Sequence, residues 1–241
     1  VNGDLLRWWV IAAGSGRWVY VPGAAWVGRL GDSTLANDIP RLLAERRQDA
    51  GIDNGGILQQ AIKGNRLLDD GAGLLGMVYG ESVMDRFERD ALNQPGVSKI
   101  FIKVGANDII HTNCESMKGE AKVVTADEMI AAYTELIKKA NEKEIEDYLF
   151  TRSAWKGYTR NLLGLKDDIQ WTQELDQIRQ DINAWIRSDE NPADGAIDLD
   201  FMCQDSNEAT QLRDEYTTDG VHFTAQGQQA LVDAIPLEVF N

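Results

Sequence analysis

The chain has 241 residues, enough for one large domain or two small ones, and enough to bury a core without a metal or a disulfide. It carries 24 basic and 39 acidic residues, a net charge of −15. This charge argues against a nucleic-acid partner or an anionic membrane surface, because phosphate groups bind to basic patches. The composition is 43% hydrophobic and 26% charged, as in ordinary globular proteins. No run of 18 apolar residues occurs, so no integral membrane association is expected.

The first 24 residues are rich in Trp and Val. The runs 8–11 and 18–21 are typical of short strands, because glycine-containing turns interrupt them. We expect an N-terminal β-rich segment over 1–24, with the remnant of an accessory region as one interpretation, and a domain over 25–241. The chain does not start with a basic stretch followed by an apolar one, so no signal peptide is expected. A mature, secreted chain would look the same.

After residue 24, strand patterns alternate with helix patterns. Strands are predicted at 25–30, 100–104, 148–150 and 196–199, and helices at 126–142, 175–186 and 225–235, the last capped by Thr224. Strands alternating with helices imply βαβ units. The expected fold is therefore α/β, with three layers, α/β/α, around a central parallel sheet of about five strands. We find no internal repeat and no low-complexity linker.

Two cysteines, Cys114 and Cys203, lie far apart in the sequence. Neither belongs to a CxxC pair, and no histidine stands at a zinc-binding spacing. They fit two separate buried thiols, or one disulfide of a secreted protein. The sequence leaves both possibilities open.

Ligands bind at the carboxyl ends of the strands in a parallel α/β sheet. Four segments occupy such positions: Gly31-Asp32-Ser33, Gly64-Asn65-Arg66, Gly105-Ala106-Asn107-Asp108 and Asp219-Gly220-Val221-His222.

The last segment pairs an acid with one of only two histidines in the chain. Asp219 stands three residues before His222, close enough to bind the ring Nδ1 hydrogen and stabilise the imidazolium of a general base. This spacing also arises by chance. The other histidine, His111, is expected in a surface loop, with a contact to substrate as the alternative.

The other three segments each allow a catalytic and a structural interpretation. Ser33 at a strand-to-helix turn can expose its Oγ as a nucleophile, or this turn can cap a helix. Gly64 allows close approach of the backbone to a ligand, or forms an ordinary turn. Asn107 can donate its amide to a developing oxyanion, or form an Asx-turn.

Together, Ser33, Gly64, Asn107 and His222 resemble the SGNH hydrolase superfamily, the GDSL esterases, whose four blocks occur in this chain order. Further segments are similar to the secreted branch of GDSL-like lipases and acylhydrolases. These segments are Gly64-Asn65-Arg66-Leu67-Leu68, Phe87-Glu88-Arg89-Asp90, Gln94-Pro95-Gly96-Val97 and Ile182-Asn183-Ala184-Trp185-Ile186-Arg187. The resemblance covers residues 25–240. The sequence departs from that branch in the short spacing from Ser33 to Pro40, and in Ile39, which stands where Trp is usual.

The resemblance implies a flavodoxin-like sheet and a serine esterase that acts through an acyl-enzyme. Ser33 would be the nucleophile, with Ser15 as the alternative, while His222 would be the base and Asp219 its orienting acid. The oxyanion hole would comprise the backbone N–H groups of Ser33 and Gly64 and the amide of Asn107. The resemblance implies no cofactor and no metal. It also implies that Arg66 and Asp108 hold the block loops together.

The expected partner is a small-molecule or carbohydrate ester, with short acyl groups such as acetyl favoured, and secretion is expected from the branch. Two alternatives remain open: an acyltransferase with the same acyl-enzyme, and a carbohydrate-binding module of the same fold without catalytic activity. The sequence does not indicate the oligomeric state.

Overall fold

The computed structural model describes residues 25–34, 38–52, 55–71, 76–112, 122–158 and 169–240. The predicted β-rich segment 1–24, with Ser15, lies outside these residues, as does Cys114. The described residues form five strands, namely β1 (Ala25–Gly31), β2 (Gly55–Gln59), β3 (Val97–Lys103), β4 (Glu146–Phe150) and β5 (Gly195–Ile197). Their α-helices are α1 (Ile39–Asp49), α2 (Gly76–Tyr79), α3 (Val83–Phe87), α4 (Ala106–Thr112), α5 (Ala126–Asn141), α6 (Gln173–Ile186), α7 (Leu199–Cys203) and α8 (Ala225–Ala234). A π-helical turn (Glu88–Leu92) and two 3₁₀ turns (Asp214–Tyr216 and Leu237–Phe240) complete the described elements.

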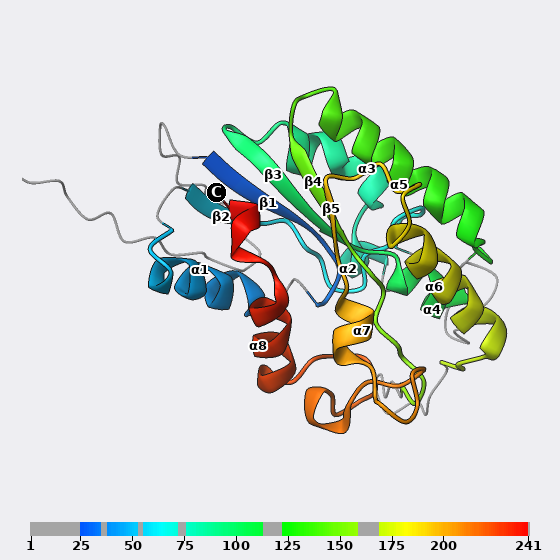
Figure 1. Ribbon diagram of the computed structural model, residues 1–241. Coiled ribbons are helices and arrows are strands. Elements are labelled where there is room, and N and C mark those ends of the chain that lie inside the picture. Colours follow the sequence, from blue (N-terminus) through cyan, green and yellow to red (C-terminus); the bar gives the residue numbers. More distant parts are fainter. Residues whose placement is uncertain are drawn as a thin grey trace, which may run out of the picture.

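The five strands form one sheet in the order β2-β1-β3-β4-β5, and every neighbouring pair is parallel. Helices cover both faces (Figure 1). One apolar cluster packs between the sheet and α3 to α6, and a second between the sheet and α1, α7 and α8. This confirms the predicted three-layer fold with its parallel, flavodoxin-like sheet. The strand order reverses beside β1, so the carboxyl ends of β1 and β3 border the crevice where ligands bind in such sheets.

The predicted elements are found close to their expected bounds. Helix α5 begins with a capping box, in which Thr125 Oγ1 accepts from the N–H of Glu128 and the Glu128 carboxylate accepts from the N–H of Thr125. Thr224 caps α8, as predicted. The strand expected over 196–199 ends at Ile197 instead, because Asp198 accepts from the N–H of Phe201 and so starts α7.

Helices α1 and α8 lie side by side on one face, although they are nearly two hundred residues apart in sequence (Figure 1). Arg46 of α1 donates to the carbonyl oxygens of Val232 and Ile235, at 2.6 and 2.5 Å. The N–H of Asp38, before α1, donates to Gln228 Oε1 at 3.0 Å. These contacts fix the last helix against the first one.

Two buried titratable groups, Asp147 and Cys203, lie in the core of the fold. Asp147 of β4 is fully buried, and neither of its side-chain oxygens has a hydrogen-bond partner in the described part of the chain. Burial, together with the charge of Asp194, raises the pKa of Asp147 to about 7. Cys203 is buried and forms no disulfide among the described residues, and burial raises the pKa of its thiol to about 12. Because Cys114 lies outside those residues, the choice between two thiols and one disulfide stays open.

Candidate active site

The turn after β1 carries Ser33, which is half-buried between two buried neighbours. The N–H of Asp32 donates to the carbonyl of Lys103, and the Asp32 carboxylate accepts from the N–H of Thr34 at 3.0 Å. Helix α1 starts only at Ile39 with Asp38 as its N-cap. The alternative in which Asp32, Ser33 or Thr34 caps that helix is therefore wrong, and the turn is held by the sheet instead.

The second block lies in the loop after β2. Gly64 has a φ of +76°, and a Cβ at this position would overlap the ring of Tyr79, so only glycine fits without rearrangement. The neighbouring Asn65 is fully buried and ties this loop to the next segment, since its amide donates to the carbonyl oxygens of Tyr79 and Glu81, both at 2.8 Å. Its own Oδ1 accepts from Arg86. The backbone at Gly64 is thus held from several sides.

The third block opens α4, directly after β3. Asn107 Nδ2 donates to the carbonyl of Asn65 at 3.0 Å, which joins this block to the second one. Asp108 accepts from the N–H groups of Leu67 and Leu68, at 2.8 and 2.9 Å. Arg66 is buried in the same loop and donates to the carbonyl of Asp70. The predicted structural roles of Arg66 and Asp108 are confirmed.

Burial raises the pKa of Asp108 to about 6, because desolvation of the charged form exceeds the stabilisation by the Leu67 and Leu68 N–H groups and by Arg66. The link between the second and third blocks therefore depends on a carboxylate that is costly to ionise.

The fourth block forms a turn directly before α8. The His222 ring Nδ1 lies 2.6 Å from Asp219 Oδ2, while Asp219 Oδ1 accepts from the N–H groups of Val221 and His222. Burial opposes ionisation of Asp219, but the hydrogen bonds from the His222 ring and backbone and from Val221 outweigh it and lower the pKa of this carboxyl. A carboxylate on Nδ1 leaves Nε2 as the basic nitrogen of the ring, and the side chain of His222 is 45% exposed.

Gly220, inside this turn, packs on the segment that follows β4. Its φ is +92°, and a Cβ here would lie 2.5 Å from the backbone nitrogen of Tyr158. The Tyr158 ring stands edge-on to His222, with 5.7 Å between the ring centroids. The orientation of His222 therefore depends on this contact as well as on Asp219.

Two of the four blocks are linked directly, and the first is tied to β3 just before the third block begins. The Asp32 backbone and carboxylate bind Lys103 of β3, and the second and third blocks share the Asn65–Asn107 and Leu67–Asp108 hydrogen bonds. The fourth block is anchored through α8, which is fixed against α1. Within the described residues Ser33 and His222 share no hydrogen bond, so their pairing stays a prediction.

Sequence reasoning placed His111 wrongly and missed three neighbours of the site. His111 is not in a surface loop. It is 4% exposed on α4 and stacks on Tyr79, with 5.4 Å between ring centroids. Tyr79 and Tyr158 gave no signal in the sequence. Lys103 did give one, because it is a charged residue at the end of the otherwise apolar run Ile100-Phe101-Ile102.

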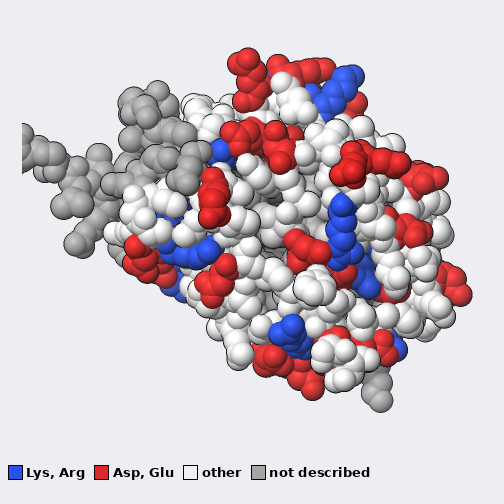
Figure 2. All heavy atoms as spheres, in the orientation of Figure 1, with Lys and Arg blue, Asp and Glu red and all other residues white. Residues whose placement is uncertain are grey.

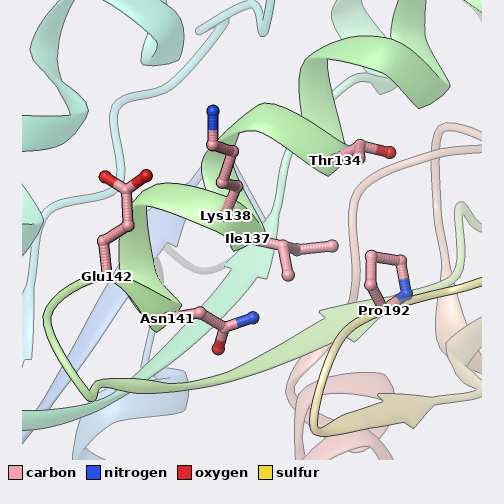
Figure 3. Close-up of a pocket in the computed structure, with 6 residues that line it drawn as sticks. All are labelled: Thr134, Ile137, Lys138, Asn141, Glu142 and Pro192. Atoms are coloured by element: carbon pink, nitrogen blue, oxygen red, sulfur yellow. The ribbon is translucent and has the colours of Figure 1, made fainter.

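A pocket of about 440 Å³ lies elsewhere, between the end of α5 and the loop before β5 (Figure 3). Ile137, Lys138 and Asn141 line it from the helix, and Pro192 lines it from the loop. Helix α5 ends where β4 begins, so this pocket sits at the amino ends of the strands, away from the four blocks. It is therefore not the candidate active site.

The described residues contain no group of three or more His, Cys, Asp or Glu side chains arranged to hold a metal ion. Among the helices built from these residues, none is long and apolar enough to cross a membrane. Figure 2 shows acidic side chains spread over the face in view, with basic ones set among them rather than gathered in one patch.

Residues 11–235 match the sequence profile of the family described as GDSL-like lipase/acylhydrolase. The chain belongs to this family. The match begins inside the segment 1–24, so the predicted division of the GDSL domain from an accessory segment at residue 24 stays a prediction. A comparison with curated proteins finds no significant match.

Solved structures similar to this GDSL protein share its fold at low sequence identity. The acetyl xylan esterase AlAXEase has a TM-score of 0.62 at 21% identity, over 87% of this chain and 97% of its own. A variant of Axe2, an acetyl xylan esterase from Geobacillus stearothermophilus, has a TM-score of 0.65 at 17% identity, over 91% and 96% of the two chains. A GDSL-like lipase from Bacteroides thetaiotaomicron has a TM-score of 0.56 at 16% identity, over 89% and 87%.

Proposed function

We propose that this GDSL protein is a serine esterase that hydrolyses carboxylic esters through an acyl-enzyme. The observation that carries the proposal is the 2.6 Å contact between His222 Nδ1 and Asp219, which prepares Nε2 to take a proton. Ser33 follows β1, next to the central strand β3, and among the described residues no hydrogen bond occupies its Oγ. Family membership and the linked oxyanion blocks support the same chemistry.

In the proposed reaction His222 Nε2 removes the proton from Ser33 Oγ, which attacks the ester carbonyl. The backbone N–H groups of Ser33 and Gly64 and the amide of Asn107 bind the oxyanion. His222 then gives the proton to the leaving alcohol, and a water molecule repeats the sequence to release the acid. Asp219 stays ionised throughout, in keeping with its lowered pKa, and stabilises the imidazolium.

We propose short acyl groups, acetyl above all, on a carbohydrate or small-molecule alcohol. Two solved structures of the same fold are acetyl xylan esterases, and this supports the proposal at the level of fold. The net charge of −15 disfavours polyanionic substrates, because like charges slow the encounter. Polymeric acetylated carbohydrates are met outside the cell, so secretion is part of the same proposal.

The test is hydrolysis of p-nitrophenyl acetate, butyrate and octanoate, and of acetylated xylo-oligosaccharides, by the wild type and by Ser33→Ala. We expect activity that falls with acyl length and disappears in Ser33→Ala. Ser15→Ala is the matched control, since Ser15 is the alternative nucleophile, and it should keep wild-type activity. Loss of activity in Ser15→Ala alone would move the nucleophile. Ligand binding without hydrolysis by any variant would favour a binding module, and ester formation with added alcohols would favour an acyltransferase.

A further inference from the structure

Lys103, the last residue of β3, lies buried beside the turn that carries Ser33. Its ammonium Nζ donates to both carboxylate oxygens of Asp32 at 3.0 Å, and to Thr34 Oγ1 at 2.7 Å. The side chains of Lys103 and Asp32 are 3% and 2% exposed. An ammonium has three hydrogens to donate, and here each has its own acceptor.

These acceptors stand on both sides of Ser33 in the sequence. The backbone repeats the pattern, because the N–H of Asp32 donates to the carbonyl of Lys103 and the N–H of Thr34 donates to Asp32 Oδ1. Ser33 takes no part in these contacts. One residue of β3 thus holds the two neighbours of the candidate nucleophile and leaves its Oγ unoccupied.

Stability alone does not account for a lysine at this position. A buried ion pair costs so much desolvation that apolar residues of similar size often stabilise a fold equally well or better. The cost is visible here, because burial lowers the pKa of Lys103 below its ordinary value although Asp32 opposes the shift. What an ion pair provides beyond an apolar contact is a defined geometry.

The geometry matters because the reacting groups come from different strands. Ser33 follows β1, whereas Asn107 follows β3 only four residues after Lys103. We propose that Lys103 is a positioning residue, which holds the Ser33 turn in register with the Asn107 block for attack on the ester. This inference rests on the proposed esterase function and assigns a role to a residue outside the triad and the oxyanion hole.

The test replaces Lys103 by Met and by Arg, and measures kcat and KM for p-nitrophenyl acetate. A loose Ser33 turn leaves substrate binding intact, so for Lys103→Met we expect a loss of about 100-fold in kcat with KM nearly unchanged. Phosphorylation of Ser33 by diethyl p-nitrophenyl phosphate, which releases p-nitrophenolate, should slow by a similar factor, because this reaction uses the same nucleophile but does not need the acyl pocket. Lys103→Arg, which keeps the charge and several donors, should recover part of both rates.

Two further variants separate positioning from folding. Asp32→Asn/Lys103→Met removes the charge that the single variant leaves unpaired, and the new amide oxygen can still accept from Thr34. We expect it to regain thermal stability over Lys103→Met, but not kcat. The matched control is Arg179→Met, since Arg179 is also a buried cation paired with two carboxylates, Asp176 and Asp200. It should lower the melting temperature and leave kcat unchanged.

The outcomes are distinguishable. If the wild type neither hydrolyses esters nor reacts with the organophosphate, the proposed esterase function fails. If the wild type is active and Lys103→Met keeps its kcat, Lys103 is only structural. The same conclusion follows if the loss of kcat relative to the loss of melting temperature is equal in Arg179→Met and Lys103→Met. If Lys103→Met does not fold, the kcat of the double variant Asp32→Asn/Lys103→Met decides. A low kcat supports the positioning role, and a kcat like that of the wild type shows that Lys103 is only structural.

Discussion

A side-chain amide has two hydrogens, and in Asn107 one of them is already directed at the carbonyl of Asn65. The hydrogen bond to Asn65 fixes the plane of the amide, so the second hydrogen has a defined direction before any substrate binds. The oxyanion donor proposed here is therefore held in place before the reaction starts, which is the condition for strong electrostatic stabilisation of a transition state.

Asn107→Ala removes that donor. We expect kcat to fall by about 10²–10³-fold with a small change in KM, because the oxyanion forms only in the transition state. Loss of the bond to Asn65 should also lower the free energy of unfolding by about 1 kcal/mol. Asn191→Ala is the control, since Asn191 also donates its amide to a backbone carbonyl, that of Ile186, outside the candidate site. A similar loss of kcat in both variants would contradict the oxyanion role.

Gly64 and Gly51 allow backbone strain to be separated from steric overlap. Their φ values are +76° and +73°, but a Cβ at Gly64 would overlap Tyr79, whereas at Gly51 it would meet nothing within 4 Å. Gly51→Ala should lower the free energy of unfolding by about 1–2 kcal/mol, because alanine is strained in the left-handed conformation but meets no neighbouring atom here. Gly64→Ala should cost clearly more and also lower kcat. Equal losses in urea unfolding would show that Tyr79 moves aside freely.

At the scale of elements, the sequence predicted the helices that show a clear apolar period and missed the shortest helices. Helices α5, α6 and α8 show apolar residues at helical spacing, and each was predicted nearly to its ends. Helices α2, α3 and α4 have four to seven residues, too few for a period to be visible. His111 was misplaced for this reason, because it belongs to α4 and so faces Tyr79.

The contacts of the candidate site also fall into those that the sequence predicts and those that it does not. The contact between Asp219 and His222 could be predicted because it is local, with a spacing of three residues. The Lys103–Asp32 and Asn107–Asn65 contacts span 71 and 42 residues and depend on which strands are neighbours. Strand order is set by the packing of the whole sheet, and no single segment encodes it.

The capping box of α5 provides a prediction at this scale. Thr125→Ala removes the oxygen that accepts from the N–H of Glu128, and should lower the free energy of unfolding by about 1 kcal/mol. Thr134→Ala, in the exposed middle of the same helix, should change it by less than half of that. Esterase activity should stay unchanged in both. Equal destabilisation of the two variants in urea would show that the cap adds nothing.

At the scale of the whole molecule, Asp147 should shape the dependence of stability on pH. Its pKa is about 7 in the folded chain and near 3.8 when unfolded, so between these values the folded state binds more protons. Stability from this group is complete below pH 4 and is lost as the pH rises towards 7. Asp147→Asn should therefore raise the free energy of unfolding at pH 8, by an amount on the order of 1.4 kcal/mol for each pKa unit.

The measurement is urea unfolding of Asp147→Asn and wild type from pH 4 to 8. The exposed Asp189→Asn, in the loop that follows α6, removes the same charge without changing a buried group, and should leave the pH profile parallel to that of the wild type. A profile of Asp147→Asn that also stays parallel to the wild type would show that Asp147 finds a partner when it ionises.

The contact between α1 and α8 has a consequence for the order of events in the cell. Synthesis delivers the serine turn well before the histidine turn, and only docking of α8 on α1 fixes the histidine turn in place. On the proposed mechanism, the hydroxyl of Ser33 stays inert on a growing chain that does not yet contain His222, because its base does not yet exist. Catalysis then begins only after α8 has been made and has docked on α1, so that a growing chain cannot attack esters before this part of it has folded.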